Sequence, residues 1–146
     1  LRVLKLGNNS IGGQLPAGLF QCAALEHLDV SMNMIRGCIS PALGQLTKLR
    51  QLRLQSNKIE GSVPPSLARC TKLVHLDLSD NFLTGKLPTQ IIARCSRLMV
   101  VDLRDNELQR RFIDAAHAHF RRRPRKGRAV YLEGQRATRS RHLTQR

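Results

Sequence analysis

Residues 49–72 read LRQLRLQSNKIEGSVPPSLARCTK, and this frame recurs along most of the 146-residue chain. Within it, Leu49, Leu52, Leu54 and Asn57 mark four fixed positions. The same positions recur in copies that start at 1, 25, 73 and 98, with valine in place of some leucines. Five copies in register indicate a repeat architecture, in which each unit buries its apolar face only by stacking on its neighbours.

The first half of each unit alternates polar and apolar residues, as in Gln51, Leu52, Arg53 and Leu54. A period of two predicts a short β-strand with one buried face. Because every unit runs in the same direction, stacking predicts parallel pairing. The predicted strands are residues 3–6, 27–30, 51–54, 75–78 and 99–103.

An asparagine follows each predicted strand, at the ninth position of its unit. Its amide both donates and accepts hydrogen bonds, so it can satisfy backbone groups of its own unit and of the neighbouring unit. Stacked units would turn these amides into an internal ladder. The ladder residues are Asn9, Asn33, Asn57, Asn81 and Asn106.

The second half of the unit repeats an order of apolar residue, glycine, apolar residue and proline, as in Ile59, Gly61, Val63 and Pro64. The glycine permits a tight bend, and the proline fixes an extended return path. A short helical turn is then predicted on the outer side, for example over residues 65–71. The fourth unit is one residue longer than the others.

The complete pattern, LxxLxLxxNxxxGxxPxxLxxCxx, resembles the plant-type leucine-rich repeat family over residues 1–97, with a partial fifth unit to Leu108. The resemblance implies an α/β repeat solenoid. This is a right-handed leucine-rich repeat superhelix with a parallel concave β-sheet and short helical or 3-10 turns on the convex side. It also implies a second short sheet around the Gly-x-apolar-Pro segment.

The same class of repeat is similar to the ectodomains of plant leucine-rich repeat receptor-like kinases and receptor-like proteins. By this resemblance, the ligand is a peptide, a steroid or a partner receptor. Family ectodomains usually start with a paired-cysteine cap, and none is present here. The sequence is therefore expected to be a fragment of a longer protein.

The C-terminal quarter of the chain departs from the frame and is strongly basic. Residues 109–146 hold 12 basic and 2 acidic side chains, out of 25 and 10 in the whole chain. We therefore expect repeats over residues 1–115, with the fifth unit partly degraded, and a basic, disordered tail over residues 116–146.

A degraded sixth unit is the alternative for this segment. Val130 and Leu132 follow Val101 and Leu103 by the same 29 residues. The segment contains few apolar residues, however, so it offers little surface to bury and the disordered tail is favoured.

The sequence offers no support for catalysis, a metal or a cofactor. The frame places no serine or cysteine nucleophile beside a histidine, and no Gly-rich phosphate loop occurs. The cysteines lack zinc-ligand spacing; Cys22, Cys70 and Cys95 share one inward position as predicted free core thiols, and Cys38 is more exposed.

Five aromatic residues leave little for base stacking, which disfavours a nucleic-acid partner. No apolar run in the chain is long enough to cross a bilayer.

Candidate ligand-binding residues are those that the frame places on the outward, concave side of the strands. They are His27, Asp29, Gln51, Arg53, Gln55, His75, Asp77, Asp80, Asp102, Arg104 and Asp105. Lys5, Asp29, Arg53 and Asp77 alternate in sign, which is also the pattern of a cross-strand charge ladder. The four carboxylates of the last two units form either a solvated face or a binding spot for a basic peptide.

These observations predict a non-enzymatic binding module for a protein or peptide ligand, with a co-receptor as a further candidate partner. By resemblance, the module belongs to an ectodomain that perceives a signal at the extracellular face of the plasma membrane, and any kinase domain lies in a longer parent protein. The alternative is an intracellular leucine-rich repeat scaffold whose basic tail contacts nucleic acid or an anionic membrane.

Overall fold

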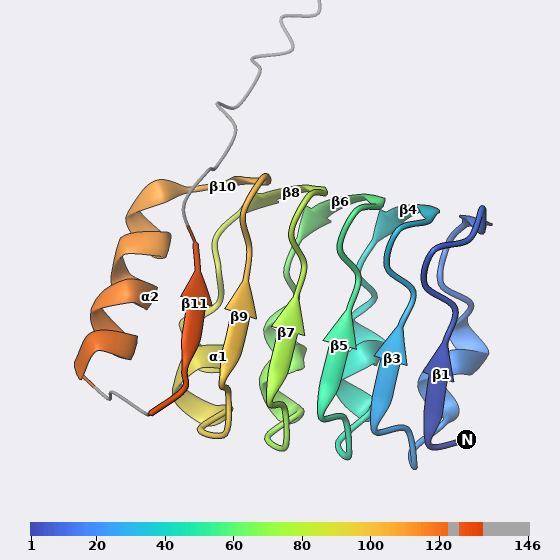
Figure 1. Cartoon of the computed structure of the whole chain (residues 1–146), viewed down its shortest axis with the longest axis horizontal. Helices are drawn as coiled ribbons and strands as arrows, with labels where there is room; N and C mark the ends of the chain where they lie inside the picture. The colour runs from blue at the N-terminus through green and yellow to red at the C-terminus, as the bar shows by residue number, and fades with distance from the viewer. Residues whose placement is uncertain (123–125, 133–146) are drawn as a thin grey trace, which may run out of the picture.

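The computed structural model describes residues 1–122 and 126–132, and its main feature is a parallel six-stranded sheet (Figure 1). The strands are β1 Val3–Lys5, β3 His27–Asp29, β5 Gln51–Arg53, β7 His75–Asp77, β9 Val100–Asp102 and β11 Ala129–Tyr131. Equivalent positions pair, so that Leu28, Leu52 and Leu76 lie in one row. The first five strands confirm the predicted strands and their parallel pairing.

A second sheet of five short parallel strands forms where each unit bends. Its strands are β2 Gly12–Gly13, β4 Met34–Cys38, β6 Lys58–Ser62, β8 Phe82–Gly85 and β10 Glu107–Leu108. The bend uses residues such as Gly61, whose φ of 77° lies in the left-handed region. The second sheet that the family resemblance implied is thus confirmed.

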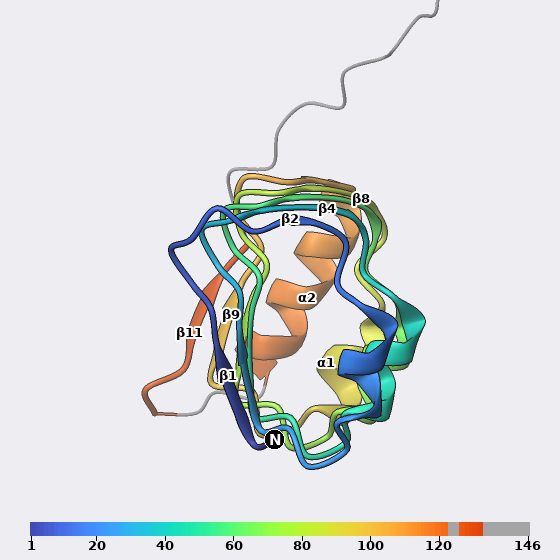
Figure 2. The same cartoon turned by 90° about the vertical axis from the view of Figure 1, so that its right-hand side faces the viewer.

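Short helices occupy the side of each unit opposite the six-stranded sheet. They are the 3-10 helices η1 Ala17–Gln21, η2 Pro41–Gln45 and η3 Pro65–Arg69, and the α-helix α1 Thr89–Arg94. Figure 2 shows the units as nested loops with these helices stacked along one side. The fold class predicted from the repeat, parallel strands alternating with short helical turns, is confirmed.

The extra residue of the fourth unit explains why α1 differs from its neighbours. In the third unit, the Cys70 amide donates to the Leu67 carbonyl, a step of three residues at 3.0 Å. In the fourth, the Cys95 amide donates to Ile91, a step of four at 2.9 Å. The inserted residue is therefore absorbed by widening a 3-10 turn into an α-turn, and the strand register is kept.

The core lies between the two sheets and the helices, and it is almost entirely aliphatic. Strand and helix leucines such as Leu52 and Leu67 are 0% exposed. Cys70 and Cys95 are buried among them, and burial raises the pKa of Cys70 to about 12 and that of Cys95 to about 11. These two thiols, half-buried Cys22 and exposed Cys38 are free in the structure, as the repeat frame predicted.

The asparagine amides connect consecutive units inside this core. The Asn57 Nδ2 group donates to the carbonyls of Val30 and Leu54, at 3.0 and 3.1 Å, and Oδ1 accepts from the Ile35 amide at 2.9 Å. Asn81 and Asn106 make the equivalent bonds and are 1% and 0% exposed. Each amide thus satisfies backbone groups that the bend removes from water.

The structure corrects the predicted boundary at residue 115, because that residue lies inside the helix α2 Arg110–Arg122. Ile113, Ala116 and Phe120 form the buried side of α2, which covers the end of the core. The expectation of a disordered tail from residue 116 is therefore wrong for 116–122 and 126–132. The apolar positions three and four residues apart carried the helical signal, and the strong positive charge obscured it.

Strand β11 belongs to the same correction. Val130 pairs with Val101 in parallel register, as the sixth-unit alternative required, although the longer connection through α2 interrupts the 24-residue frame. Leu132 is 0% exposed. The rest of the expected tail, residues 133–146, lies outside the described residues.

The asparagine bonds predict a large effect of Asn57→Ala on stability. The change leaves buried carbonyl and amide groups of two units without a partner, so we expect a loss of about 1–3 kcal/mol in the free energy of unfolding. Urea denaturation measures it. Asn9→Ala is the matched control, since Asn9 is exposed and its side-chain amide donates to the Leu6 and Gly7 carbonyls of its own unit. Equal losses for the two variants would contradict an inter-unit role.

The packing of α2 predicts that Phe120→Ala destabilises the whole solenoid. Phe120 is 7% exposed, whereas Phe82 on β8 is 44% exposed. Truncating a buried phenylalanine costs about 3–5 kcal/mol, so Phe120→Ala should lower the urea midpoint far more than Phe82→Ala. If the two variants unfold at the same urea concentration, α2 does not stabilise the core.

Candidate functional site

The outward side chains of β3, β5, β7 and β9, with the turns that follow these strands, form a surface that we call the strand face. The parallel register places His27, Gln51 and His75 in one row. The adjacent row consists of Asp29, Arg53, Asp77 and Asp102. The remaining candidate residues lie in the turns: Gln55, Asp80, Arg104 and Asp105.

Two of the aspartates in this face stabilise their own turns. Asp29 Oδ1 accepts hydrogen bonds from the Ser31 amide and hydroxyl at 3.1 and 2.6 Å. Asp77 does the same with Ser79 at 3.1 and 2.7 Å. The Arg53–Asp29 pair is long, at 3.9 Å between Nη1 and Oδ2. The alternating charges therefore act mainly through local turns rather than through a continuous ladder of ion pairs.

The centre of the strand face contains buried polar atoms without a partner. Arg53 Nε and Gln55 Oε1 are shielded from solvent and make no hydrogen bond within residues 1–122 and 126–132. One is a donor and the other an acceptor, and they come from the same strand end, two residues apart. An unsatisfied buried polar pair of this kind is costly and marks a place where a ligand can gain binding energy.

His75 lies on the neighbouring strand, in the row of Gln51. Burial lowers the pKa of His75 from its ordinary value of 6.5, and the positive charge of Arg53 lowers it further. Asp77 and Asp102 oppose this shift. The imidazole is therefore neutral at pH 7 and presents one donor and one acceptor nitrogen.

Arg104 is held in place at the C-terminal end of the strand face. Its Nε and Nη2 atoms donate to Asp102 at 3.0 and 2.6 Å, and Asp102 is only 6% exposed. The guanidinium also stacks over the Tyr131 ring at 4.7 Å, a cation–π contact. Sequence reasoning missed Tyr131, because β11 was expected to be disordered.

Asp80 and Asp105 occupy turn positions that require left-handed backbone. Their φ angles are 51° and 56°, and the equivalent residues Met32 and Ser56 have 53° and 54°. Aspartate adopts this conformation more readily than most residues. Across the described part of the chain, no three side chains come together in a way that could hold a metal ion. The carboxylates of the last two units thus have separate structural roles.

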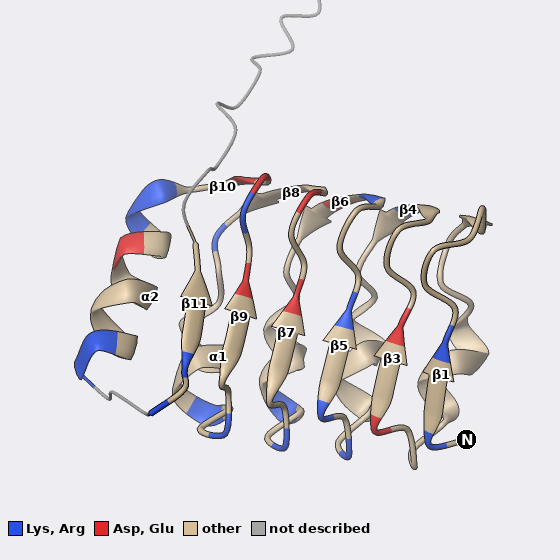
Figure 3. Ribbon diagram, in the orientation of Figure 1, with Lys and Arg blue, Asp and Glu red and all other residues tan. Residues whose placement is uncertain are grey.

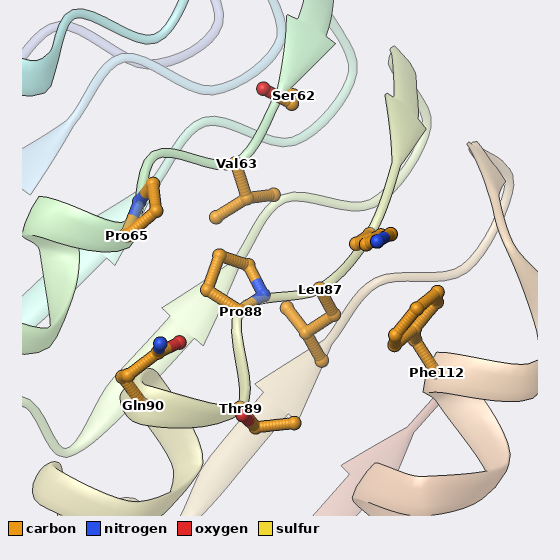
Figure 4. Close-up of a pocket in the computed structure, with 9 residues that line it drawn as sticks. Ser62, Val63, Pro65, Leu87, Pro88, Thr89, Gln90 and Phe112 are labelled. Carbon is orange, nitrogen blue, oxygen red and sulfur yellow. The ribbon is translucent and has the colours of Figure 1, made fainter.

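A cleft of about 440 Å³ lies away from the strand face, between α2 and the bends of the third and fourth units (Figure 4). Pro65, Leu87, Pro88 and Phe112 provide its apolar walls. Lys86 lies 5.2 Å from the Phe112 ring centre. Because α2 supplies one wall, the repeat frame could not have predicted this cleft.

Comparison with known families identifies the repeat directly. A leucine-rich repeat model matches residues 1–59, and a model of two leucine-rich repeat copies matches residues 47–91. No curated protein sequence matches the chain. None of the described helices is long and apolar enough to cross a membrane.

Solved structures from plants share the fold. The ectodomain of the Arabidopsis thaliana membrane receptor kinase GASSHO1/SCHENGEN3, solved in complex with CASPARIAN STRIP INTEGRITY FACTOR 2, is 35% identical with a TM-score of 0.73; the match covers 75% of this chain and 13% of that one. The BIR3–SERK2 complex from Arabidopsis thaliana gives 36% identity and 0.69, covering 73% of this chain and 56% of that one.

A third match is the Arabidopsis receptor kinase HAESA, solved with the peptide hormone IDA and the co-receptor SERK1. It is 30% identical with a TM-score of 0.71, and the match covers 74% of this chain and 18% of that one. This chain thus spans between 13% and 56% of the three structures. The repeated frame, the parallel sheets and both matching models show that the chain belongs to the leucine-rich repeat family.

Proposed function

We propose that this chain is a protein- or peptide-binding module, part of the extracellular ectodomain of a plant receptor-like kinase or receptor-like protein that perceives a signal. The likeness to the receptor kinase HAESA, which was solved with a peptide hormone and a co-receptor, supports this. The ligand lies on the strand face, and a co-receptor is the second partner. In this role the chain binds and does not catalyse.

The observation that carries this proposal is the unsatisfied pair at the end of β5, Arg53 Nε and Gln55 Oε1. A peptide bond offers a carbonyl that accepts and an amide that donates. When the Arg53 and Gln55 side chains turn outward, a peptide laid across the strand face presents its carbonyl to Arg53 Nε and its amide to Gln55 Oε1, the two atoms without a partner in the described part of the chain. Side chains at Gln51, His27 and His75 line the next row and contribute specificity through hydrogen bonds.

Selection of peptides tests this directly. A phage-displayed library of random peptides is selected on the full chain, and the affinity of the best peptide is measured by calorimetry. Arg53→Met and Gln55→Met should each weaken it about tenfold or more, because each removes one of the paired hydrogen bonds.

Arg36→Met is the matched control, since Arg36 is an exposed arginine on β4, outside the strand face. It should leave the affinity unchanged. Selected peptides that bind Arg53→Met and Gln55→Met as tightly as the parent would contradict a peptide site on β5.

The same geometry predicts an unusual titration of His75. We expect its NMR titration midpoint below 6.5, and we expect Arg53→Gln to raise it, because the positive charge that opposes protonation is removed. The unfolded chain takes up this proton near 6.5 while the folded chain does not, so stability is lost as the pH falls below that value. A midpoint that stays unchanged or falls in Arg53→Gln would contradict an effect of the Arg53 charge on His75.

A further inference from the structure

One edge of the solenoid carries a row of cations that the strand face does not include. Each unit turns from its outer helix into its strand here, through residues 22–26, 46–50, 70–74, 95–99 and 126–128. The exposed cations on these turns and at the ends of η3 and α1 form what we call the basic edge: Lys48, Arg69, Lys72, Arg94, Arg97 and Lys126. Figure 3 shows this blue row along the lower edge of the sheet.

The positive charge of the basic edge is not neutralised by the fold. None of its six cations forms an ion pair with a carboxylate within residues 1–122 and 126–132. Glu26 is the only acidic residue in the five turns, and it already binds Arg2 at 2.6 Å and Arg50 at 3.5 Å. Like charges in a row repel, so a negatively charged partner lowers the free energy of this edge.

We propose that the basic edge binds an acidic polysaccharide, a linear chain of uronic acid sugars. The second unit contributes one of these cations and the third and fourth units two each, so positive charge continues along the stack, where adjacent units are about 4.8 Å apart at the strands. A polyuronate carries one carboxylate on each ring, so its charge is also linear and evenly spaced. A linear row of carboxylates can therefore lie along the row of cations, and several weak ion pairs form at once.

The neighbouring side chains favour a carbohydrate over other polyanions. Thr47, Thr71 and Ser96 are exposed and each precedes a cation of the edge, which gives hydroxyl groups for sugar hydroxyls. The five turns contain no aromatic residue, so they offer no stacking platform for nucleic-acid bases. They also expose no large apolar side chain that would insert into a membrane.

The test uses the full chain and polygalacturonate oligomers, with neutral dextran as the uncharged comparison. The edge variant is Lys48→Gln/Lys72→Gln/Arg97→Gln. The control variant is Arg36→Gln/Lys58→Gln/Arg110→Gln, which removes the same charge from exposed positions on β4, β6 and the start of α2. Circular dichroism and urea denaturation confirm that both variants are folded.

We expect the edge variant to lose about tenfold in polygalacturonate affinity at low salt and to depend less on salt, because three exposed ion pairs are removed. The control variant should change by less than about twofold. Peptides selected on the strand face should bind the edge variant normally, so this result is separate from the proposed function.

Three outcomes would overturn the proposal. Equal losses in the two variants would mean that only net charge matters. Absence of binding, or equal binding of dextran, would remove the site. Tighter edge-dependent binding of single-stranded DNA or of phosphatidylserine vesicles would assign the basic edge to a nucleic acid or to a membrane instead.

Discussion

Every unit of this solenoid bends sharply just after its strand, and the backbone groups at that bend must find hydrogen-bond partners away from water. The asparagine at each bend meets this requirement. Each of four asparagines donates a hydrogen bond to a carbonyl of the preceding unit at 2.9–3.0 Å and accepts a hydrogen bond from a backbone amide of that unit. They are Asn33, Asn57, Asn81 and Asn106. One side chain thus satisfies two units at once, which makes a unit stable only in the stack.

This constraint fixes the register of everything else. Because each asparagine locks one unit onto the next, equivalent residues lie side by side, and the leucine rows close into one core. The same register places the variable, outward residues of neighbouring units next to one another, so that they form continuous surfaces. The strand face is one such surface, and the basic edge follows the turns that the same register aligns.

The segment after the fifth unit is stabilised differently. There α2 packs Ile113, Ala116 and Phe120 against the core, and β11 then joins the sheet beside β9. Arg128 then donates to the Leu98 carbonyl at 2.9 Å and stacks over Phe120 at 5.1 Å. The aliphatic part of such a basic side chain covers apolar surface, and its guanidinium group stacks on an aromatic ring. A strongly charged sequence can therefore still fold here.

The sequence by itself determined the parallel strands, the buried asparagines and the outward rows, because each depends on local spacing repeated in register, whereas the second sheet was implied by the family resemblance of the repeat. It placed Arg53, Gln55 and His75 on one face for the same reason. Only the tertiary structure decided that α2 and β11 are ordered, that Tyr131 stacks on Arg104, that Asp102 is paired and that Phe112 closes a cleft. Each of these contacts occurs once and depends on side chains that the repeat does not share, and those of α2 and β11 join segments far apart in the chain, so the repeated spacing does not predict them. Their formation depends on burial and geometry that exist only after the stack has formed.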